Sequence, residues 1–302
     1  MSSLLIEVGA THTRARVITN TSEPIFEKVY ETSKFKSSTD LVKTILTQSK
    51  TKKCDLIALA IAGPHSFDSI IMTHTKLVFT ASELEQQFKT KIFLCNDVYS
   101  QALALSTSSF KSIYEGYPQG FTKVVISIGT GLGVACTYQR EGKLVILSTE
   151  AGHSLFAGQT EEDELFCDLL KKRLNKHFIE WEDILSGKGL ESLYFFLSGK
   201  EDTIEKISSY ESTDLFAKKT FELFSKYVAK FSQQCALEYL AQGGIYLSGG
   251  VIAKHSQFSI SEFRKNLCDH DSFKQLLKDI PINITQNDFL GLEGLASVAL
   301  SK

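Results

Sequence analysis

The sequence lacks an excess of charge of either sign. Its 302 residues include 33 Lys and Arg against 35 Asp and Glu, so the formal net charge is −2. A nucleic-acid-binding protein usually carries a clustered basic face, and an interaction tail needs a run of like charges. The composition therefore argues against nucleic acid as a partner.

Long hydrophobic runs and clustered cysteines are also absent. No stretch approaches the roughly 20 apolar residues that a membrane span needs. The N-terminus, MSSLLIEVGA, has neither the basic nor the apolar region of a signal peptide. The six cysteines are dispersed without a CxxC pair, which favours reduced thiols over a disulfide framework or a zinc site. We therefore expect a cytoplasmic protein with no membrane partner.

The residues that are present make an ordinary globular composition, with 43% apolar and 23% charged residues. At roughly 150 residues per domain, the length suggests about two domains.

Two segments of the chain resemble each other at a fixed offset. Residues 4–18 read LLIEVGATHTRARVI and residues 124–138 read VVISIGTGLGVACTY, so Gly9 corresponds to Gly129. Each segment predicts a buried strand, a tight glycine turn and a returning hairpin strand. A second pair, DLIALAIAGP and GGIYLSGGV, predicts two more buried strands that end at glycine. Two related α/β halves are the simplest account.

Helix signals occur between these strands. In TASELEQQF, Thr80 and Glu83 form the pattern of a capping box. KIFLC, residues 91–95, is typical of a strand, and residues 213–240 have the apolar spacing of a long helix. The polar stretch 198–212 is linker-like, and we expect it to connect helices rather than to separate domains.

The motif ISIGTGLGVA places Gly129, Thr130, Gly131 and Gly133 in one strand-to-strand turn. Small residues let backbone N–H groups converge on phosphate oxygens. No Lys follows the last glycine and no helix comes next, so the turn is neither a P-loop nor a dinucleotide fingerprint. Phosphate binding and a plain tight hairpin both fit it.

A strand that ends in Asn96 and Asp97 runs directly into a predicted helix. In open α/β sheets, ligands collect at the carboxyl ends of strands. An Asp there can take a proton from an attacking hydroxyl, which is the role that phosphoryl transfer asks of a base. The alternative is that the Asn-Asp pair only caps the helix.

The segment STEAGHSLFAG holds Glu150 and His153 on a turn of small residues. A carboxylate and an imidazole at this spacing can hydrogen-bond adjacent hydroxyls of a polyol. An exposed loop is the alternative, and a metal pair is less favoured because no third ligand lies nearby in the sequence. Glu182 and Asp183 begin a helical turn, where acidic residues often only complement the helix dipole. Together these features indicate a phosphotransferase with a hydroxylated substrate.

As an ordered set, these motifs resemble those of the bacterial glucokinase family, within the superfold of actin, hexokinase and the heat-shock ATPases. The resemblance covers essentially the whole chain. Its segments, in order, are EVGATHTR, AIAGP, LCND, IGTGLGVA, EAGH, EDILSGKGLESLY, GGIYLSGGV and GLEGLA.

The resemblance implies an α/β fold of two ribonuclease H-like, actin-like ATPase lobes around a central cleft. The small lobe would comprise residues 1–105 plus 290–302, and the large lobe residues 106–289 with helical additions. It also implies transfer of the γ-phosphoryl group of ATP to the 6-hydroxyl of glucose with Mg²⁺, and a homodimer as the family expectation.

Site roles follow from the resemblance position by position. Asp97 is the expected general base and also contacts the sugar, together with four further residues: Asn96, Glu150, His153 and Glu182. The expected ATP-binding residues are Gly9, Ala10, Thr11, Gly129, Thr130, Gly131, Gly249 and Gly250. Glu7 is the expected magnesium residue, acting through water.

The first glycine turn departs from the family pattern, which has Asp, Gly and Asn where this chain has Glu7, Ala10 and His12. Ala10 adds a Cβ that would weaken nucleotide binding if its backbone needs a positive φ. Further departures stand at His74, Leu77, Ser127 and Lys188.

Other functions stay open at this point. The chain could be a catalytically weak sugar-binding sensor or regulator, although a first strand at Leu4 leaves no room for an N-terminal DNA-binding helix-turn-helix. It could also phosphorylate another hexose or an amino sugar. An actin-like ATPase without a sugar would leave Glu150, His153 and Glu182 unexplained.

Overall fold

The computed structural model describes residues 2–21, 23–51, 53–73, 75–209, 213–254 and 258–301. His74 lies outside them. The chain divides into two compact units. Unit 1 comprises Met1–Ser109, Ile146–Ser148 and Phe289–Lys302, and unit 2 comprises Phe110–Val145 and Thr149–Asp288.

The sheet of unit 1 has the strand order β3-β2-β1-β4-β8. β1 (Ser3–Val8), β2 (His12–Ile18) and β3 (Pro24–Glu31) form an antiparallel meander. β4 (Leu56–Ile61) runs parallel to β1, and β8 (Lys91–Asn96) runs parallel to β4. The carboxyl ends of β1, β4 and β8 therefore share one edge of the sheet.

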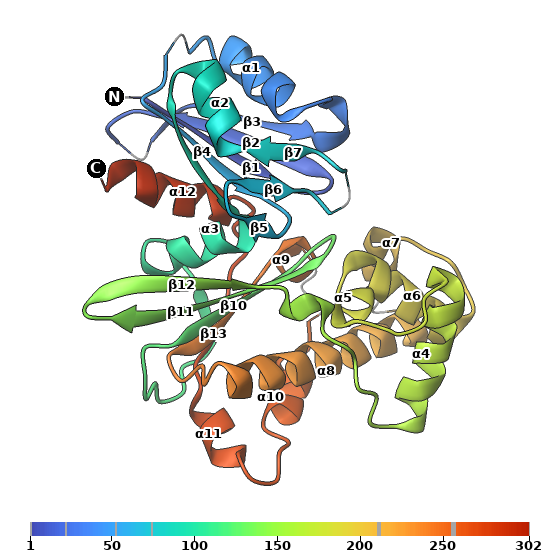
Figure 1. Ribbon diagram of the computed structural model, residues 1–302. Coiled ribbons are helices and arrows are strands. Elements are labelled where there is room, and N and C mark those ends of the chain that lie inside the picture. The colour runs from blue at the N-terminus through green and yellow to red at the C-terminus, as the bar shows by residue number, and fades with distance from the viewer. Residues whose placement is uncertain are drawn as a thin grey trace. The chain divides into compact units, whose positions relative to one another are not determined.

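Helices cover both faces of this sheet (Figure 1). Because successive side chains of a strand point to opposite faces, Leu4 and Ile6 of β1 pack with α1 (Ser38–Gln48) and α2 (Ala81–Phe88). Leu5 packs on the other face with α12 (Leu290–Leu300), and α12 packs against α3 (Asp97–Leu103). The alternation places Glu7 on this second face.

Shorter elements complete unit 1. They are the small sheet of β5 (His65–Ser66), β6 (Ser69–Ile71) and β7 (Val78–Thr80), with the 3₁₀ turns η1 (Thr32–Lys34) and η2 (Ala104–Ser106).

The sheet of unit 2 has the order β12-β11-β10-β13-β14-β9. β10 (Lys123–Ile128) and β11 (Leu132–Arg140) form an antiparallel hairpin, followed in the chain by β12 (Lys143–Thr149). β13 (Gly244–Ser248) and β14 (Ile282–Ile284) extend the sheet in parallel, and β9 (Lys111–Tyr114) closes it antiparallel.

The core of unit 2 lies between this sheet and a layer of helices in which α8 is central: α8 packs against β10, α6 and α10. The helical elements are η3 (Ala151–His153), α4 (Glu161–Leu174), α5 (Trp181–Ile184), α6 (Gly187–Ser198), α7 (Ile204–Ser209), α8 (Leu215–Glu238), α9 (Gly250–Lys254), α10 (Ile260–Leu267) and α11 (Lys274–Asp279).

The two sheets repeat one topology. In each, a hairpin with a glycine turn, β1–β2 or β10–β11, is extended by two strands parallel to its first strand. The prediction of two related α/β halves is confirmed, as are the strand at β8 and the long helix at α8. Within the described residues no helix is long and apolar enough to cross a membrane.

Two local predictions need correction. Thr80 is the residue before α2, but its side chain makes no capping hydrogen bond. Asp68 takes that role, because its carboxylate accepts from Ser82 N at 3.3 Å and from Ser82 Oγ at 2.6 Å. The linker-like stretch is helical in part, because its described residues, 198–209, contain the short helix α7. These residues lie within unit 2, as expected for a connection between helices, and residues 210–212 lie outside the described residues.

Candidate functional site

The carboxyl edge of the unit 1 sheet carries the first glycine turn and the Asn-Asp pair. Gly9 follows β1 and Asn96 ends β8, while between them Ala62 N, just after β4, donates to Val8 O at 3.0 Å. The predicted unit 1 residues are thus brought to one edge, which is where open α/β sheets bind ligands.

The first glycine turn is held by a residue that the sequence does not reveal. Gly9 N donates to His12 O at 3.0 Å and closes the hairpin. Thr32, which is 1% exposed, donates from Oγ1 to Gly9 O at 2.8 Å and from its backbone N to Thr11 O at 3.0 Å. Ala10 is not among the residues with positive φ, so its Cβ causes no backbone strain.

Asn96 is the N-cap of α3. Its Oδ1 accepts from Val98 N at 2.9 Å and Tyr99 N at 3.2 Å, and its Nδ2 donates to Gly63 O at 3.0 Å. Asp97 is the first residue of α3, and its Oδ1 accepts from Val98 N at 3.0 Å. The helix-capping alternative is therefore correct for Asn96. It does not exclude a catalytic role for Asp97, because a helix N-terminus favours an ionised carboxylate.

Glu7 is a buried carboxylate on the α12 face of the sheet. Its Oε2 lies 4.0 Å from Nη1 of Arg14, its cross-strand neighbour on β2. A Cβ at Gly291 would lie 2.6 Å from Glu7 Oε1, so the glycine of α12 makes room for the longer side chain. Glu7 could supply one oxygen ligand to a metal shell, directly or through water.

In unit 2, the second glycine turn follows β10 and meets two helix N-termini. Gly187, the first residue of α6, donates its N–H to Gly129 O at 3.0 Å. A Cβ added at Gly129 would come no closer than 3.8 Å to Gly250 N, and one at Gly250 would have no atom within 4 Å. These two positions leave open space beside backbone N–H groups, which suits a phosphate or nucleoside.

Gly249, unlike Gly250, is needed for the conformation of the backbone. Its φ is +93°, and a Cβ there would lie 2.4 Å from Ile128 O. The chain can turn from β13 into α9 this close to β10 only with glycine.

Glu182 joins the glycine turn to the predicted sugar-binding residues of unit 2. Its Oε2 accepts from Leu132 N at 2.9 Å, and a Cβ at Gly131 would lie 2.6 Å from the same oxygen. The carbonyl of Leu132 lies against Gly152, where a Cβ would come within 2.1 Å. The first residue of β11 therefore binds Glu182 through its N–H, and the turn of residues 150–153 packs closely against its carbonyl.

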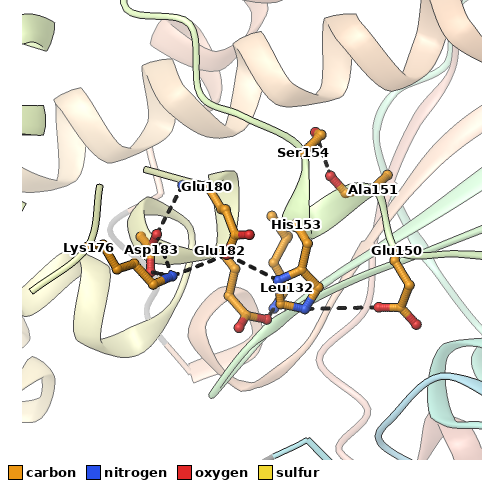
Figure 2. A network of polar contacts seen from close by, with 9 residues as sticks. All are labelled: Leu132, Glu150, Ala151, His153, Ser154, Lys176, Glu180, Glu182 and Asp183. Atoms are coloured by element: carbon orange, nitrogen blue, oxygen red, sulfur yellow. Dashed lines mark hydrogen bonds and ion pairs between the residues drawn. The ribbon is translucent and has the colours of Figure 1, made fainter. Parts of the chain in front are cut away.

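His153 lies between two carboxylates (Figure 2). Its Nδ1 is 3.4 Å from Glu180 Oε2, and its Nε2 is 4.0 Å from Glu150 Oε2. Partial burial raises the pKa of Glu150, whose side chain is 53% exposed. His153 lowers this pKa by a smaller amount, and nearby Glu182 raises it by the smallest amount. The structure brings Glu150, His153 and Glu182 close to one another in unit 2.

A cluster of three charged residues next to His153 was not predicted from the sequence: Lys176, Glu180 and Asp183. Lys176 Nζ lies 3.1 Å from Glu180 Oε2 and 2.7 Å from Asp183 Oδ1, and Asp183 Oδ2 accepts from Glu180 N at 3.0 Å (Figure 2). Burial pushes the pKa of Glu180 upward, but hydrogen bonds from Lys176 and His153 outweigh it and leave the pKa below its ordinary value.

The predicted site residues thus form two sets. Unit 1 holds Glu7, the first glycine turn and Asn96–Asp97, and unit 2 holds the second glycine turn, Gly249–Gly250 and the three polar residues around Leu132. In the described parts of the chain no group of three or more His, Cys, Asp or Glu side chains could hold a metal ion. Glu7 therefore fits magnesium only as a single ligand, with phosphate oxygens and water supplying the rest.

Comparisons with known proteins agree with one another. The model of the Glucokinase family matches residues 4–302. The chain is 28% identical to the bifunctional protein glk of Burkholderia orbicola, over 99% of this chain and 49% of that protein, so it spans about half the length of that relative. It is 29% identical to a glucokinase of Neisseria meningitidis, over 97% of this chain and 93% of the relative.

Solved structures give the same result at lower identity. A glucokinase from an Antarctic psychrotroph matches with a TM-score of 0.82 and 23% identity, covering 100% of this chain and 99% of the other. A glucokinase from Balamuthia mandrillaris in complex with glucose matches with a TM-score of 0.85 and 20% identity, covering 99% and 93%. The predicted fold class, ribonuclease H-like lobes of the actin-like ATPase type, is confirmed.

Proposed function

The chain belongs to the glucokinase family, and on that premise we propose that it transfers the γ-phosphoryl group of ATP to the 6-hydroxyl of glucose. One observation carries the proposal. Glu182 accepts a hydrogen bond from Leu132, the residue directly after the second glycine turn, and the turn that bears Glu150 and His153 packs against the same residue. Groups suited to sugar hydroxyls and a turn suited to phosphates thus lie next to each other in unit 2.

Asp97 is the proposed base. It accepts the proton of the 6-hydroxyl while that oxygen forms a bond to the γ-phosphorus, and ADP leaves with the electrons of the broken bond. Glu150, His153 and Glu182 bind the hexose hydroxyls. Asn96 contributes through Nδ2 and keeps Asp97 in place by capping α3. The lobe boundaries expected from the sequence, residues 1–105 plus 290–302 and residues 106–289, are part of the same proposal.

The glycine turns are the proposed ATP site. Backbone N–H groups of residues 9–11 and 129–131 bind phosphate oxygens, and the open positions at Gly129 and Gly250 receive the nucleotide without a clashing Cβ. Bound Mg²⁺ would neutralise phosphate charge during transfer, and Glu7 is the side chain proposed to hold one of its waters. We also propose that the protein is cytoplasmic and that it forms a homodimer.

A coupled assay of ATP consumption tests this function. Purified protein is given glucose, mannose, fructose, N-acetylglucosamine or no sugar, beside an Asp97→Ala variant. We expect glucose-dependent turnover, and a fall in kcat of about 10²- to 10⁴-fold in the variant, as for loss of a general base.

The other outcomes identify the alternatives. Turnover with another hexose or amino sugar alone would change the substrate. Turnover that needs no sugar would indicate an ATPase. No turnover, with glucose still raising the melting temperature, would indicate a sugar sensor.

A further inference from the structure

Glu180 is the charged side chain nearest to His153 that the proposed reaction does not use. Glu180 is the N-cap residue of α5, whereas His153 is the last residue of η3. The two segments are joined by backbone pairing, because Trp181 N donates to Ser154 O at 3.1 Å and Phe156 N donates to Ile179 O at 2.9 Å. The contact between Glu180 and His153 is thus fixed by the backbone on both sides.

A buried tryptophan anchors this pairing in the core of unit 2. Trp181 is 5% exposed, packs edge-on against Phe156, and donates from Nε1 to Gln234 Oε1 at 2.9 Å. With Trp181 directed into the core, its sequence neighbours Glu180 and Glu182 lie toward His153 and Leu132 respectively (Figure 2).

The chemistry of the pair fixes the proton on the ring. An ionised carboxylate can only accept hydrogen bonds, so Nδ1 of His153 must carry a proton when it bonds Glu180 Oε2 at 3.4 Å. Lys176 lies 3.1 Å from the same oxygen and favours the ionised state of Glu180. Among the described residues, the neighbour of Nε2 is Glu150 Oε2 at 4.0 Å, beyond hydrogen-bond distance. On a neutral ring with its proton on Nδ1, Nε2 is then the atom that accepts a hydrogen bond.

We propose that Glu180 is a positioning residue for the sugar site, holding His153 with its proton on Nδ1 so that Nε2 accepts a hydrogen bond from a hexose hydroxyl. Lys176 supports Glu180 in this role. The inference rests on the proposed function for the identity of the ligand, whereas the state of the His153 ring is a property of the protein alone.

Nitrogen NMR of the full-length protein labelled at histidine tests the ring directly, without any sugar. The signal of His153 is assigned with a His153→Gln variant and is expected to show the Nδ1-protonated neutral ring. In Glu180→Ala we expect that signal to move toward the Nε2-protonated form. Unchanged histidine signals in Glu180→Ala, or an Nε2-protonated ring in the unaltered protein, would overturn the proposal.

Kinetics test the consequence. Glu180→Ala should raise the KM for glucose about tenfold, the size expected for one hydrogen bond to a charged group, with the KM for ATP unchanged. Glu180→Gln, whose amide oxygen can still accept from Nδ1, should recover most of the loss. Equal losses in the Ala and Gln variants would count against the hydrogen bond.

Asp183→Ala is the matched control. It removes the bond to Glu180 N and a partner of Lys176, but keeps the carboxylate beside His153. A rise in glucose KM as large as in Glu180→Ala would show that the start of α5, not the histidine, is responsible. If the unaltered protein phosphorylates no sugar, the proposed function fails, and the NMR result still decides the role of Glu180.

Discussion

Gly129 and Gly131 lie two residues apart in one turn, yet glycine is needed at the two positions for different reasons. A Cβ at position 129 meets only ordinary contacts, the nearest at 3.8 Å, whereas a Cβ at 131 would lie 2.6 Å from Glu182 Oε2. The first position keeps space open for a ligand, and the second keeps room for a carboxylate of the protein.

This difference predicts opposite kinetic effects. Gly129→Ala should raise the KM for ATP, because the added methyl group occupies the nucleotide's space, and should leave the KM for glucose and the melting temperature nearly unchanged. Gly131→Ala should displace Glu182 and raise the KM for glucose. Steady-state kinetics on both variants, with thermal melts, measure this. A shift of the same substrate's KM in both would contradict the assignment.

Glu150 predicts how sugar binding depends on pH. Burial, with nearby Glu182, raises its pKa above the ordinary value of 4.5. The ionised carboxylate is the better acceptor for hydroxyls, so the KM for glucose should begin to rise on acidification at a higher pH than an ordinary glutamate would give. Glu150→Gln should remove this limb of the pH profile, and a profile unchanged by the substitution would count against the role.

The same shift acts on stability in the opposite direction. Because the folded pKa lies above the unfolded one, the folded state binds more protons in the window between them, and stability contributed by Glu150 falls as pH rises through that window. Acidification should therefore weaken glucose binding. At the same time it should remove the free-energy cost that the ionised Glu150 imposes on the folded state. Loss of binding at mildly acidic pH is thus distinguishable from unfolding.

Single residues also mark the limit of the sequence interpretation. Asp97, Glu150, His153 and Glu182 could be singled out because each stands beside a strand end or a small-residue turn. Thr32 and Glu180 could not. Thr32 reaches Gly9 across 23 positions and Glu180 reaches His153 across 27, and no local pattern encodes such contacts.

At the scale of elements, the close packing of α12 on α3 depends on glycine. A Cβ at Gly294 would lie 1.7 Å from Ser100 O and 3.2 Å from Leu103 Cβ. The helices can approach this closely only because that atom is missing.

Gly294→Ala should therefore destabilise the protein. Alanine favours a helix by about 1 kcal/mol over glycine, but overpacking typically costs about 1–3 kcal/mol and here the contact is with backbone, which cannot move aside. We expect a lower free energy of unfolding by urea denaturation. Ser297→Ala on the same helix is the control and should cost less, and a stabilised Gly294→Ala would refute the packing argument.

The elements themselves were largely predictable, for a physical reason. β1 and β10, the strands that precede the glycine turns, are largely buried on both faces, so their apolar runs stand out, and the repeat of Gly9 at Gly129 relates the halves. The cap of α2 was not predictable from TASELEQQF, because Asp68 approaches Ser82 from a preceding turn and leaves Thr80 without its expected role.

At the scale of the whole molecule, each unit has its own hydrophobic core. Unit 2 is built around one cluster, and unit 1 around the two clusters on either face of its sheet. Each sheet also presents its own glycine turn at the carboxyl ends of parallel strands. The residues proposed for the reaction come from both units: Asp97 belongs to unit 1, and Glu150, His153 and Glu182 belong to unit 2.

This division predicts how glucose affects unfolding. A ligand at about 100 times its Kd stabilises the state that binds it by about 2.7 kcal/mol. If Asp97 and Glu182 both contact the hexose as proposed, unfolding around either residue releases it, so calorimetry with glucose should show every thermal transition moving upward together. Glu182→Gln, which weakens the contacts of unit 2, should reduce the shift of all transitions alike. A shift confined to one transition, in the unaltered protein, would mean that one unit alone binds the sugar, which contradicts contacts to it from both Asp97 and Glu182.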